Sequence, residues 1–211
     1  MPILTAKVGT NADLFPDVLA LYVPKGSRVL DMTYGKGVFW RKVNEADWDL
    51  VRNDIASDRG EYHDDFRHIQ WLDASFDAVV LDPPYIYHSG AVHKEGGMHT
   101  DYRNDERAME GIYGVPAVDS MFQDGMDEAR RLLRPGGHCI VKCMDQIVGG
   151  HQVWQHITLL QMAEKMGYIP KDLFVLVRNG PVIMRHPHQI HARKNHSYFL
   201  VFQETAKAVR S

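Results

Sequence analysis

The sequence predicts an α/β fold built on one mostly parallel β-sheet. Short apolar stretches rich in β-branched residues alternate with longer stretches of helical periodicity over nearly the whole chain. One apolar stretch leads into glycines and another leads into two prolines, so each ends abruptly in an irregular segment. In open α/β sheets, ligands bind outside the carboxyl ends of the strands, so these irregular segments are candidate functional sites.

The composition is typical of one globular domain, predicted to span residues 1–211. The chain has 211 residues, 45% of them apolar, which suffices for one sizeable core. No apolar run approaches the roughly 18 residues of a membrane span, and no basic segment with an apolar run begins the chain. We therefore expect a soluble, cytoplasmic protein that is not exported. With a net charge of −3, contact with nucleic acid would require locally clustered positive charge.

The first elements expected are a helix over 14–22 and a strand over 28–31. Residues 10–13 offer N-caps for that helix, and the turn residues of 24–27 separate it from the strand. The strand ends in Asp31 and opens into a loop with glycines.

Gly35 and Gly37 allow this loop to turn tightly and to approach a ligand closely, because glycine lacks a Cβ atom. A helix is expected to begin at 39–43, and its first N–H groups would also face the ligand. A dinucleotide-binding G-x-G-x-x-G motif is excluded, because Trp40 stands at its third glycine position.

A second strand is expected over 48–54, and it ends in an acid. Asp54 at the end of this strand could accept both ribose hydroxyls of a nucleoside cofactor, with Asn53 as the neighbouring candidate. The alternative is an ordinary surface aspartate. A third strand is expected in the segment that begins at residue 61, where Asp65 could also be the N-cap of a helix over 66–72.

The run 76–81 predicts a strand buried on both faces. Pro83 cannot continue a central strand, so Asp82, Pro83, Pro84 and Tyr85 form a stiff, extended segment at its carboxyl end. A carboxylate, peptide carbonyls and an aromatic ring together suit a flat exocyclic amine such as N6 of adenine. The alternative is an acidic strand end followed by a proline turn.

The second half of the chain continues the alternation. Leu133–Gly137 ends a helix over 118–133 and turns the chain. The remaining expected elements are a strand at 138–143, a helix at 151–166, and strands at 172–178 and 197–202. Cys139 and Cys143 are too few and too close for a disulfide framework, so we expect buried thiols in a reducing compartment.

The residues Asp82–Tyr85 resemble the D-P-P-Y motif of S-adenosylmethionine-dependent amino methyltransferases, which modify adenine N6 or cytosine N4. The segment from Asp31 to Gly37 is similar to methyltransferase motif I, D-x-F-x-G-x-G, with Thr33 where phenylalanine is usual. Leucine, proline and two glycines before a strand, as at 133–137, are also common in the class I methyltransferases.

The resemblance implies a class I methyltransferase (Rossmann-like) fold with seven strands, the last one antiparallel, and S-adenosylmethionine as the methyl donor. It also implies that His63–Arg67 carries an acid that touches the adenine of the cofactor, with Asp65 preferred and Asp64 as the alternative. Residues 195–202 resemble the closing strand of many prokaryotic and phage DNA methylases, which implies a prokaryotic cell or a phage-infected host. The implied catalytic residues are Asp82, Pro83, Pro84 and Tyr85; the implied cofactor-binding residues are Asp31, Thr33, Gly35, Gly37, Asn53, Asp54, Asp65 and Phe66.

Two loops are candidates for substrate binding. The loop 86–116 contains cationic and aromatic residues, Tyr87 and His88 among them, that suit a nucleotide; the alternative is a lid without specific contacts. The loop 185–196 could bind phosphate through Arg185, Arg193 and Lys194. Its alternatives are a metal site formed by its four histidines, for which no acid or cysteine completes the set, and an exposed polar hairpin.

These patterns favour methylation of an exocyclic base amine in DNA, with adenine N6 preferred and no metal required. The alternatives are cytosine N4, an RNA adenine or guanine amine, a protein glutamine, and a non-catalytic cofactor- or nucleic-acid-binding subunit. The chain has no room for a separate recognition domain, so a second copy or another protein could supply part of the target recognition.

Overall fold

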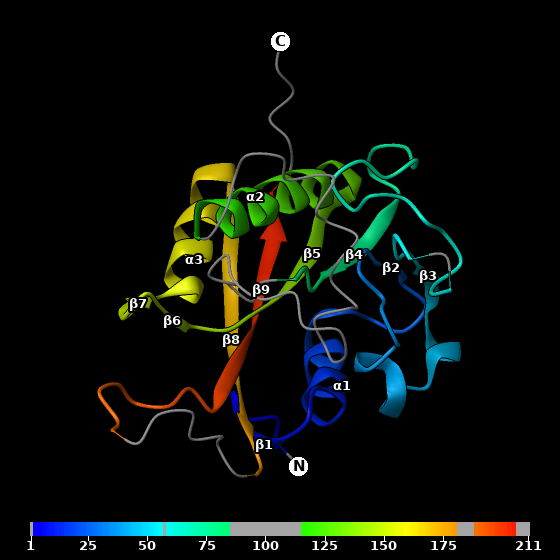
Figure 1. The fold of residues 1–211 in the computed structure, drawn as a ribbon. Helices are drawn as coiled ribbons and strands as arrows, with labels where there is room; N and C mark the ends of the chain where they lie inside the picture. The colour runs from blue at the N-terminus through cyan, green and yellow to red at the C-terminus, as the bar shows by residue number, and fades with distance from the viewer. Residues whose placement is uncertain (1, 57, 85–114, 181–187, 206–211) are drawn as a thin grey trace.

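The computed structural model describes residues 2–56, 58–84, 115–180 and 188–205. Its centre is a seven-stranded sheet of order β1-β8-β9-β5-β4-β2-β3 (Figure 1). Strand β9 is antiparallel to both of its neighbours, whereas all other pairs are parallel. The predicted α/β fold with an antiparallel last strand is therefore confirmed. The strands of this sheet are β1 (Ala6–Gly9), β2 (Arg28–Asp31), β3 (Asp49–Arg52), β4 (Phe76–Leu81), β5 (Leu133–Cys143), β8 (Tyr168–Arg178) and β9 (His196–Glu204).

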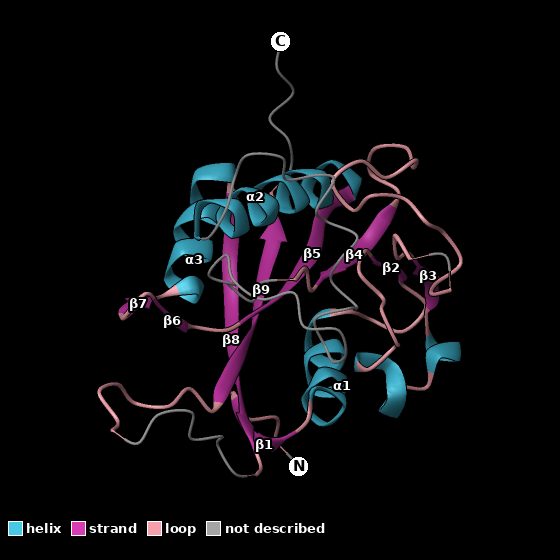
Figure 2. Ribbon diagram, viewed as in Figure 1, coloured by secondary structure: helices cyan, strands magenta, loops and turns pink. Residues whose placement is uncertain are grey.

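Helices cover both faces of the sheet (Figure 2). The helix α1 (Asn11–Tyr22) packs on one face together with the 3₁₀ turn Phe39–Lys42. The helices α2 (Val115–Leu132) and α3 (Gln155–Met166) pack on the other face. None of the helices in the described ranges has the length and apolar character needed to cross a bilayer.

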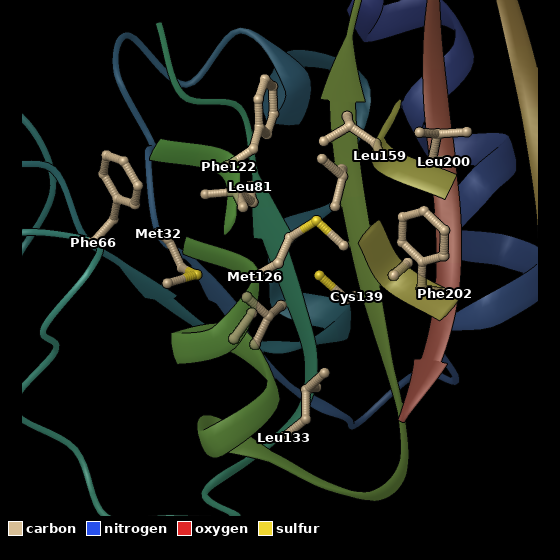
Figure 3. Packing of buried hydrophobic residues seen from close by; sticks show 14 of the residues in the cluster. Met32, Phe66, Leu81, Phe122, Met126, Leu133, Cys139, Leu159, Leu200 and Phe202 are labelled. Carbon is tan, nitrogen blue, oxygen red and sulfur yellow. The ribbon is translucent and has the colours of Figure 1, made fainter. Parts of the chain in front are cut away.

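The strand β4 lies in the middle of the sheet and is buried on both faces. Val79 and Leu81 pack under α2 and α3, whereas Ala78 and Val80 pack under α1. This explains why β4 is continuously apolar rather than alternating. Figure 3 shows the α2 side, where Met126 lies over the sheet beside Cys139 and Leu81. Cys139 and Cys143 are buried free thiols, as expected.

The segment 61–72 does not supply a strand to the sheet. The sheet has seven strands because β1, which was not predicted, pairs with β8. Residues 61–72 contain only turns and one isolated bridge, Asn53 with Tyr62, so both the third strand and the helix over 66–72 were wrong. The backbone of this segment bonds instead to side chains of α2. Glu128 accepts a hydrogen bond from the Ile69 N–H (2.7 Å), and Arg131 donates to the carbonyls of Ile69 and Trp71.

A small hairpin replaces the start of the helix that was expected over 151–166. It pairs β6 (Gln146–Val148) with β7 (His151–Val153), and α3 begins only at Gln155. Gly149 and Gly150 both have positive φ, +56° and +81°, as a tight two-residue hairpin turn requires.

Candidate active site at the carboxyl edge of the sheet

The motifs predicted from the sequence converge at the carboxyl ends of β2, β3 and β4. Backbone hydrogen bonds hold these strand ends together: Met32 N–H donates to Val80 O (3.0 Å) and Asn53 N–H donates to Asp31 O (2.9 Å). Asp31, Asp54 and Asp82 therefore lie at or just beyond the carboxyl ends of three neighbouring strands. This is the edge at which open α/β sheets bind their ligands.

Both glycines of the loop after β2 are required by its geometry. Gly35 and Gly37 have φ of +56° and +62°, in the left-handed region that favours glycine. A Cβ at Gly37 would lie 2.6 Å from the Tyr34 hydroxyl, so a side chain there would also have to displace the Tyr34 ring. The Gly35 N–H donates to Asp54 Oδ2 (2.8 Å), which ties the loop to the end of β3.

Asp54 and Asn53 differ in the hydrogen-bonding capacity that remains to them. Asp54 accepts from the N–H groups of Gly35 and Ala56, and an ionised carboxylate has further lone pairs. The buried Asn53 amide donates to the carbonyls of Met32 and Asp64 (both 3.0 Å) and accepts from the Asp64 N–H (2.9 Å). Asn53 therefore fixes the chain, whereas Asp54 keeps acceptors for a ligand.

Asp31 is held inside the protein. Trp40 Nε1 donates to Oδ2 (2.7 Å) and the Thr33 N–H donates to Oδ1 (3.1 Å). Burial nevertheless raises the pKa of Asp31 to about 7, since the two hydrogen bonds only partly offset desolvation and the charge of Asp54 adds to it. By accepting these two hydrogen bonds, Asp31 holds both ends of the glycine loop, at Thr33 and at Trp40.

Thr33 links the glycine loop to the D-P-P segment. Its hydroxyl accepts a hydrogen bond from the Asp82 N–H at 2.7 Å. At the position where motif I usually has phenylalanine, this chain therefore has a polar contact that holds the backbone of Asp82.

Asp82 has an acceptor oxygen that is not hydrogen-bonded within the described residues. This oxygen, Oδ1, is inaccessible to solvent. Burial and the charge of Asp31 raise the pKa of Asp82, and the charge of Lys142 works in the opposite direction. Pro83 is buried and Pro84 is partly buried, while Tyr85 lies outside the described residues.

Lys142 and Ser197 lie beside Asp82, and neither was predicted from the sequence. Lys142 is only 1% exposed, its ammonium donates to Ser197 Oγ (2.6 Å), and it lies 4.3 Å from the centre of the Phe199 ring. The available signal was a lysine within an otherwise buried strand, which rarely occurs without a partner.

Asp65 and Phe66 have internal partners. Burial favours the neutral form of Asp65, but hydrogen bonds and an ion pair with Arg67 outweigh it and lower the pKa of Asp65. The Phe66 ring is buried and lies against Gly125 of α2. Both residues therefore have structural contacts, and an interaction of Asp65 with a cofactor would compete with Arg67.

The candidate substrate residues divide between described and undescribed segments. Tyr87, His88 and Arg185 lie outside the described residues. Lys194 places its ammonium 5.0 Å from the ring centre of Trp154, which is 51% exposed. Arg193, the preceding residue, is partly buried. Both residues come just before β9, whose first residues pair with the carboxyl end of β5, so they lie at the same edge of the sheet as Asp82.

Close to Lys194 in the sequence and to Trp154, the side chains of His156, Tyr198 and His196 form a hydrogen-bonded network with the buried Asp145. Asp145 is 1% exposed and contacts His156 Nδ1 (2.7 Å) and the Tyr198 hydroxyl (3.2 Å), which also contacts His196 Nε2 (2.9 Å). Burial and Asp145 raise the pKa of Tyr198 to about 12, so its hydroxyl stays protonated. Within the described ranges, no group of three His, Cys, Asp or Glu residues is arranged to hold a metal ion.

No protein-family profile and no curated protein matches the sequence. Among solved structures, a proposed methyltransferase from Bacillus halodurans C-125 aligns with a TM-score of 0.58 at 13% identity, covering 91% of this chain and 99% of that chain. An S-adenosylmethionine-dependent methyltransferase from Methanosarcina mazei aligns with a TM-score of 0.55 at 10% identity, covering 89% and 97%.

A proposed DNA modification methylase from Thermus thermophilus, complexed with S-adenosyl-L-methionine, aligns with a TM-score of 0.45 at 21% identity. It covers 67% of this chain, and this chain spans about half of that protein, 51% of its length. The first two alignments extend over nearly the whole length of both chains. They show that this chain has the class I methyltransferase fold, as the sequence predicted.

Proposed function

We propose that this protein is an S-adenosylmethionine-dependent methyltransferase that methylates an exocyclic base amine in DNA, with adenine N6 as the preferred target. One observation carries the proposal. The Asp82 carboxylate follows the central strand of a methyltransferase fold, beside the glycine loop, and offers a buried oxygen without a partner among the described residues. A buried acceptor of this kind is costly unless a ligand satisfies it.

The edge formed by the glycine loop fits the proposed cofactor. Gly35 and Gly37 give the loop its left-handed turns without side chains that would block a ligand. The Asp54 carboxylate beside the loop retains acceptors for the two ribose hydroxyls. S-Adenosylmethionine would supply an electrophilic methyl group, which passes to nitrogen as the bond to sulfur breaks with its electron pair remaining on sulfur. Asp31, Thr33 and Asn53 would hold the loop in place rather than contact the cofactor.

The role of Asp82 is to make the base amine a better nucleophile. The nitrogen lone pair of such an amine is delocalised into the ring, and positive charge develops on nitrogen as it attacks. An ionised Asp82 and the Pro83 carbonyl would accept hydrogen bonds from the amine and stabilise that charge. Tyr85 would stack on the base and hold the amine in line. The amine then releases one proton to Asp82 or to water.

A nucleic-acid substrate is supported by the surface next to this edge. The exposed Trp154 ring offers a stacking face, while Lys194 and Arg193 offer positive charge for phosphate. A stacked base in a duplex cannot reach Asp82, so the target base would have to flip out or be single-stranded. The loops 86–116 and 185–196 would complete target recognition within a single domain 1–211, or with a second copy.

The test is transfer of labelled methyl from S-adenosylmethionine to duplex DNA, single-stranded DNA and RNA, followed by mass analysis of the nucleosides. We expect N6-methyladenine in DNA. Asp82→Asn keeps the size of the side chain, and we expect it to lower transfer at least about 100-fold while cofactor binding, measured by calorimetry, stays within a few-fold.

The outcomes separate the alternatives. N4-methylcytosine in DNA would change the base, and label in RNA alone would change the substrate class while keeping the mechanism. Cofactor binding without transfer to any nucleic acid would contradict the proposed activity. Loss of cofactor binding in a folded Asp82→Asn protein would show that Asp82 holds the cofactor instead of the base.

A further inference from the structure

Lys142 is a buried cation on the same face of the sheet as Asp82. Leu81 of β4 pairs with Val141 of β5, so Asp82 and Lys142 follow the last registered pair on neighbouring strands. Val80 and Ile140, two residues earlier on each strand, both pack under α1. Because side chains alternate along strands, Asp82 and Lys142 both lie on the α1 face.

The direct contacts of the Lys142 ammonium are with uncharged groups. Its ammonium donates to the neutral Ser197 hydroxyl and lies against the face of the Phe199 ring. Burial lowers the pKa of Lys142, and the opposing influences are Asp82 and Cys143. Burial keeps the Cys143 thiol protonated, so the counter-charge among the described residues is the Asp82 carboxylate.

Asp82 is in the reverse situation. Burial and the negative charge of Asp31 from β2 both favour its protonated form, and Lys142 from β5 is the group that favours its ionised form. A protonated Asp82 would present a hydroxyl donor where the base amine needs an acceptor. The ionised form of Asp82 therefore depends on the charge of Lys142.

We propose that Lys142 is a positioning residue whose charge keeps Asp82 ionised, so that Asp82 can accept a hydrogen bond from the target amine. The catalytic consequence rests on the proposed function, whereas the electrostatic linkage of the two side chains does not. A buried lysine confined to a packing role would affect stability but not the titration of Asp82.

The experiment measures the titration of Asp82 by carboxyl ¹³C NMR, with Asp82→Asn used for assignment. Lys142→Met keeps the length of the side chain and removes its charge. We expect the pKa of Asp82 to rise by about one unit or more in this variant. Lys165→Met removes an exposed lysine at the end of α3 and should leave Asp82 unchanged. An unchanged Asp82 in folded Lys142→Met protein would overturn the proposal.

A reciprocal measurement covers the case in which Lys142→Met does not fold. Since linkage is mutual, Asp82→Asn must lower the pKa of Lys142, followed through the ¹³Cε signal of the lysine. The same signal in Asp31→Asn should move less and in the opposite direction, because Asp31 acts on Lys142 through Asp82. An unchanged Lys142 titration in Asp82→Asn would also overturn the proposal.

The activity readout separates this inference from the proposed function. In Lys142→Met the acid limb of the pH–rate profile should move to higher pH, with kcat reduced and KM for the cofactor nearly unchanged. If no nucleic acid is methylated but the reciprocal titrations hold, the proposed function fails and the linkage stands. If transfer occurs with an unmoved acid limb in Lys142→Met, Lys142 does not act through Asp82.

Discussion

At the scale of single residues, the site depends on which polar groups are satisfied. Asn53 uses its whole amide on backbone groups, whereas Asp82 keeps an oxygen without a partner among the described residues. Thr33 holds the Asp82 backbone, and Gly37 leaves space for the Tyr34 hydroxyl. Asn53, Thr33 and Gly37 fix the loop geometry, and the free oxygen of Asp82 is the acceptor that a substrate would complete.

Gly37→Ala should disrupt the glycine loop more than positive φ alone requires. The new Cβ would lie 2.6 Å from the Tyr34 hydroxyl, in addition to the strain of φ +62°. Gly26 is a matched control, because it has φ +84° and, beyond its chain neighbours, no described atom within 4 Å of the position that a Cβ would take. We expect Gly37→Ala to lose about 1–3 kcal/mol more stability than Gly26→Ala and to weaken S-adenosylmethionine binding. Denaturant unfolding and calorimetry measure both, and equal losses would contradict the steric argument.

At the scale of elements, one helix holds a segment that has no regular structure of its own. Glu128 and Arg131 lie one turn apart on α2 and bond to each other and to the backbone of residues 69–71. Residues 69–71, the later part of the segment 58–72, are thus held against α2. In the earlier part of the same segment, the backbone of Asp64 hydrogen-bonds with the Asn53 side chain after β3.

Glu128→Ala should therefore release this segment. The substitution leaves the buried Ile69 N–H without its acceptor and the Arg131 guanidinium without its nearest counter-charge. We expect a loss of about 1–3 kcal/mol of stability and faster amide exchange over residues 64–71. Glu164→Ala changes an exposed glutamate of α3 and should cost less than about 0.5 kcal/mol. Unchanged exchange in Glu128→Ala would contradict the anchoring role.

Trp154, just after the β6–β7 hairpin, and Lys194, just before β9, lie next to each other. Trp154→Ala should weaken binding of single-stranded DNA by about 1–3 kcal/mol, or roughly 5- to 150-fold, through lost stacking. Lys194→Ala should reduce the salt dependence of binding by about one phosphate contact. Ile169→Ala, a similarly exposed apolar residue at the start of β8, is the control. Fluorescence anisotropy at several salt concentrations makes the comparison, and equal affinity in all three variants would exclude this surface.

At the scale of the whole molecule, buried charges at one edge couple folding to pH. Asp31, Asp82 and Lys142 are carried by β2, β4 and β5 and lie where the ends of these strands meet. Asp31 has a folded pKa raised from 3.8 to about 7 by burial, so the native state binds its proton more tightly than the unfolded chain does. The Asp31 contribution is therefore largest below about pH 4 and is lost as the pH rises to about 7.

Asp31→Asn should remove this component of the pH dependence. Wild-type stability should include a decline of up to about 4 kcal/mol between pH 4 and 7 from this group, which the variant lacks. The absolute stability of Asp31→Asn should be lower, because the NH₂ of the amide cannot accept one of the two hydrogen bonds from Trp40 and Thr33. Urea unfolding across this range measures the slope. The exposed Asp58→Asn is the control, and a slope kept in Asp31→Asn would contradict the assignment.

The α/β class and the edge at which the motifs meet could be predicted from the sequence, because periodicity and strand-end residues are local properties. The antiparallel last strand followed from the resemblance to class I methyltransferases. Other features depend on contacts between residues that are distant in the chain. Strand β1 and the turns of 61–72 depend on distant partners, β8 and α2. Asp82 and Lys142 are sixty residues apart in the chain, and they come together only because β4 and β5 are neighbours in the sheet. Burial and pairing set the charge of a side chain, and both arise only when the strands assemble.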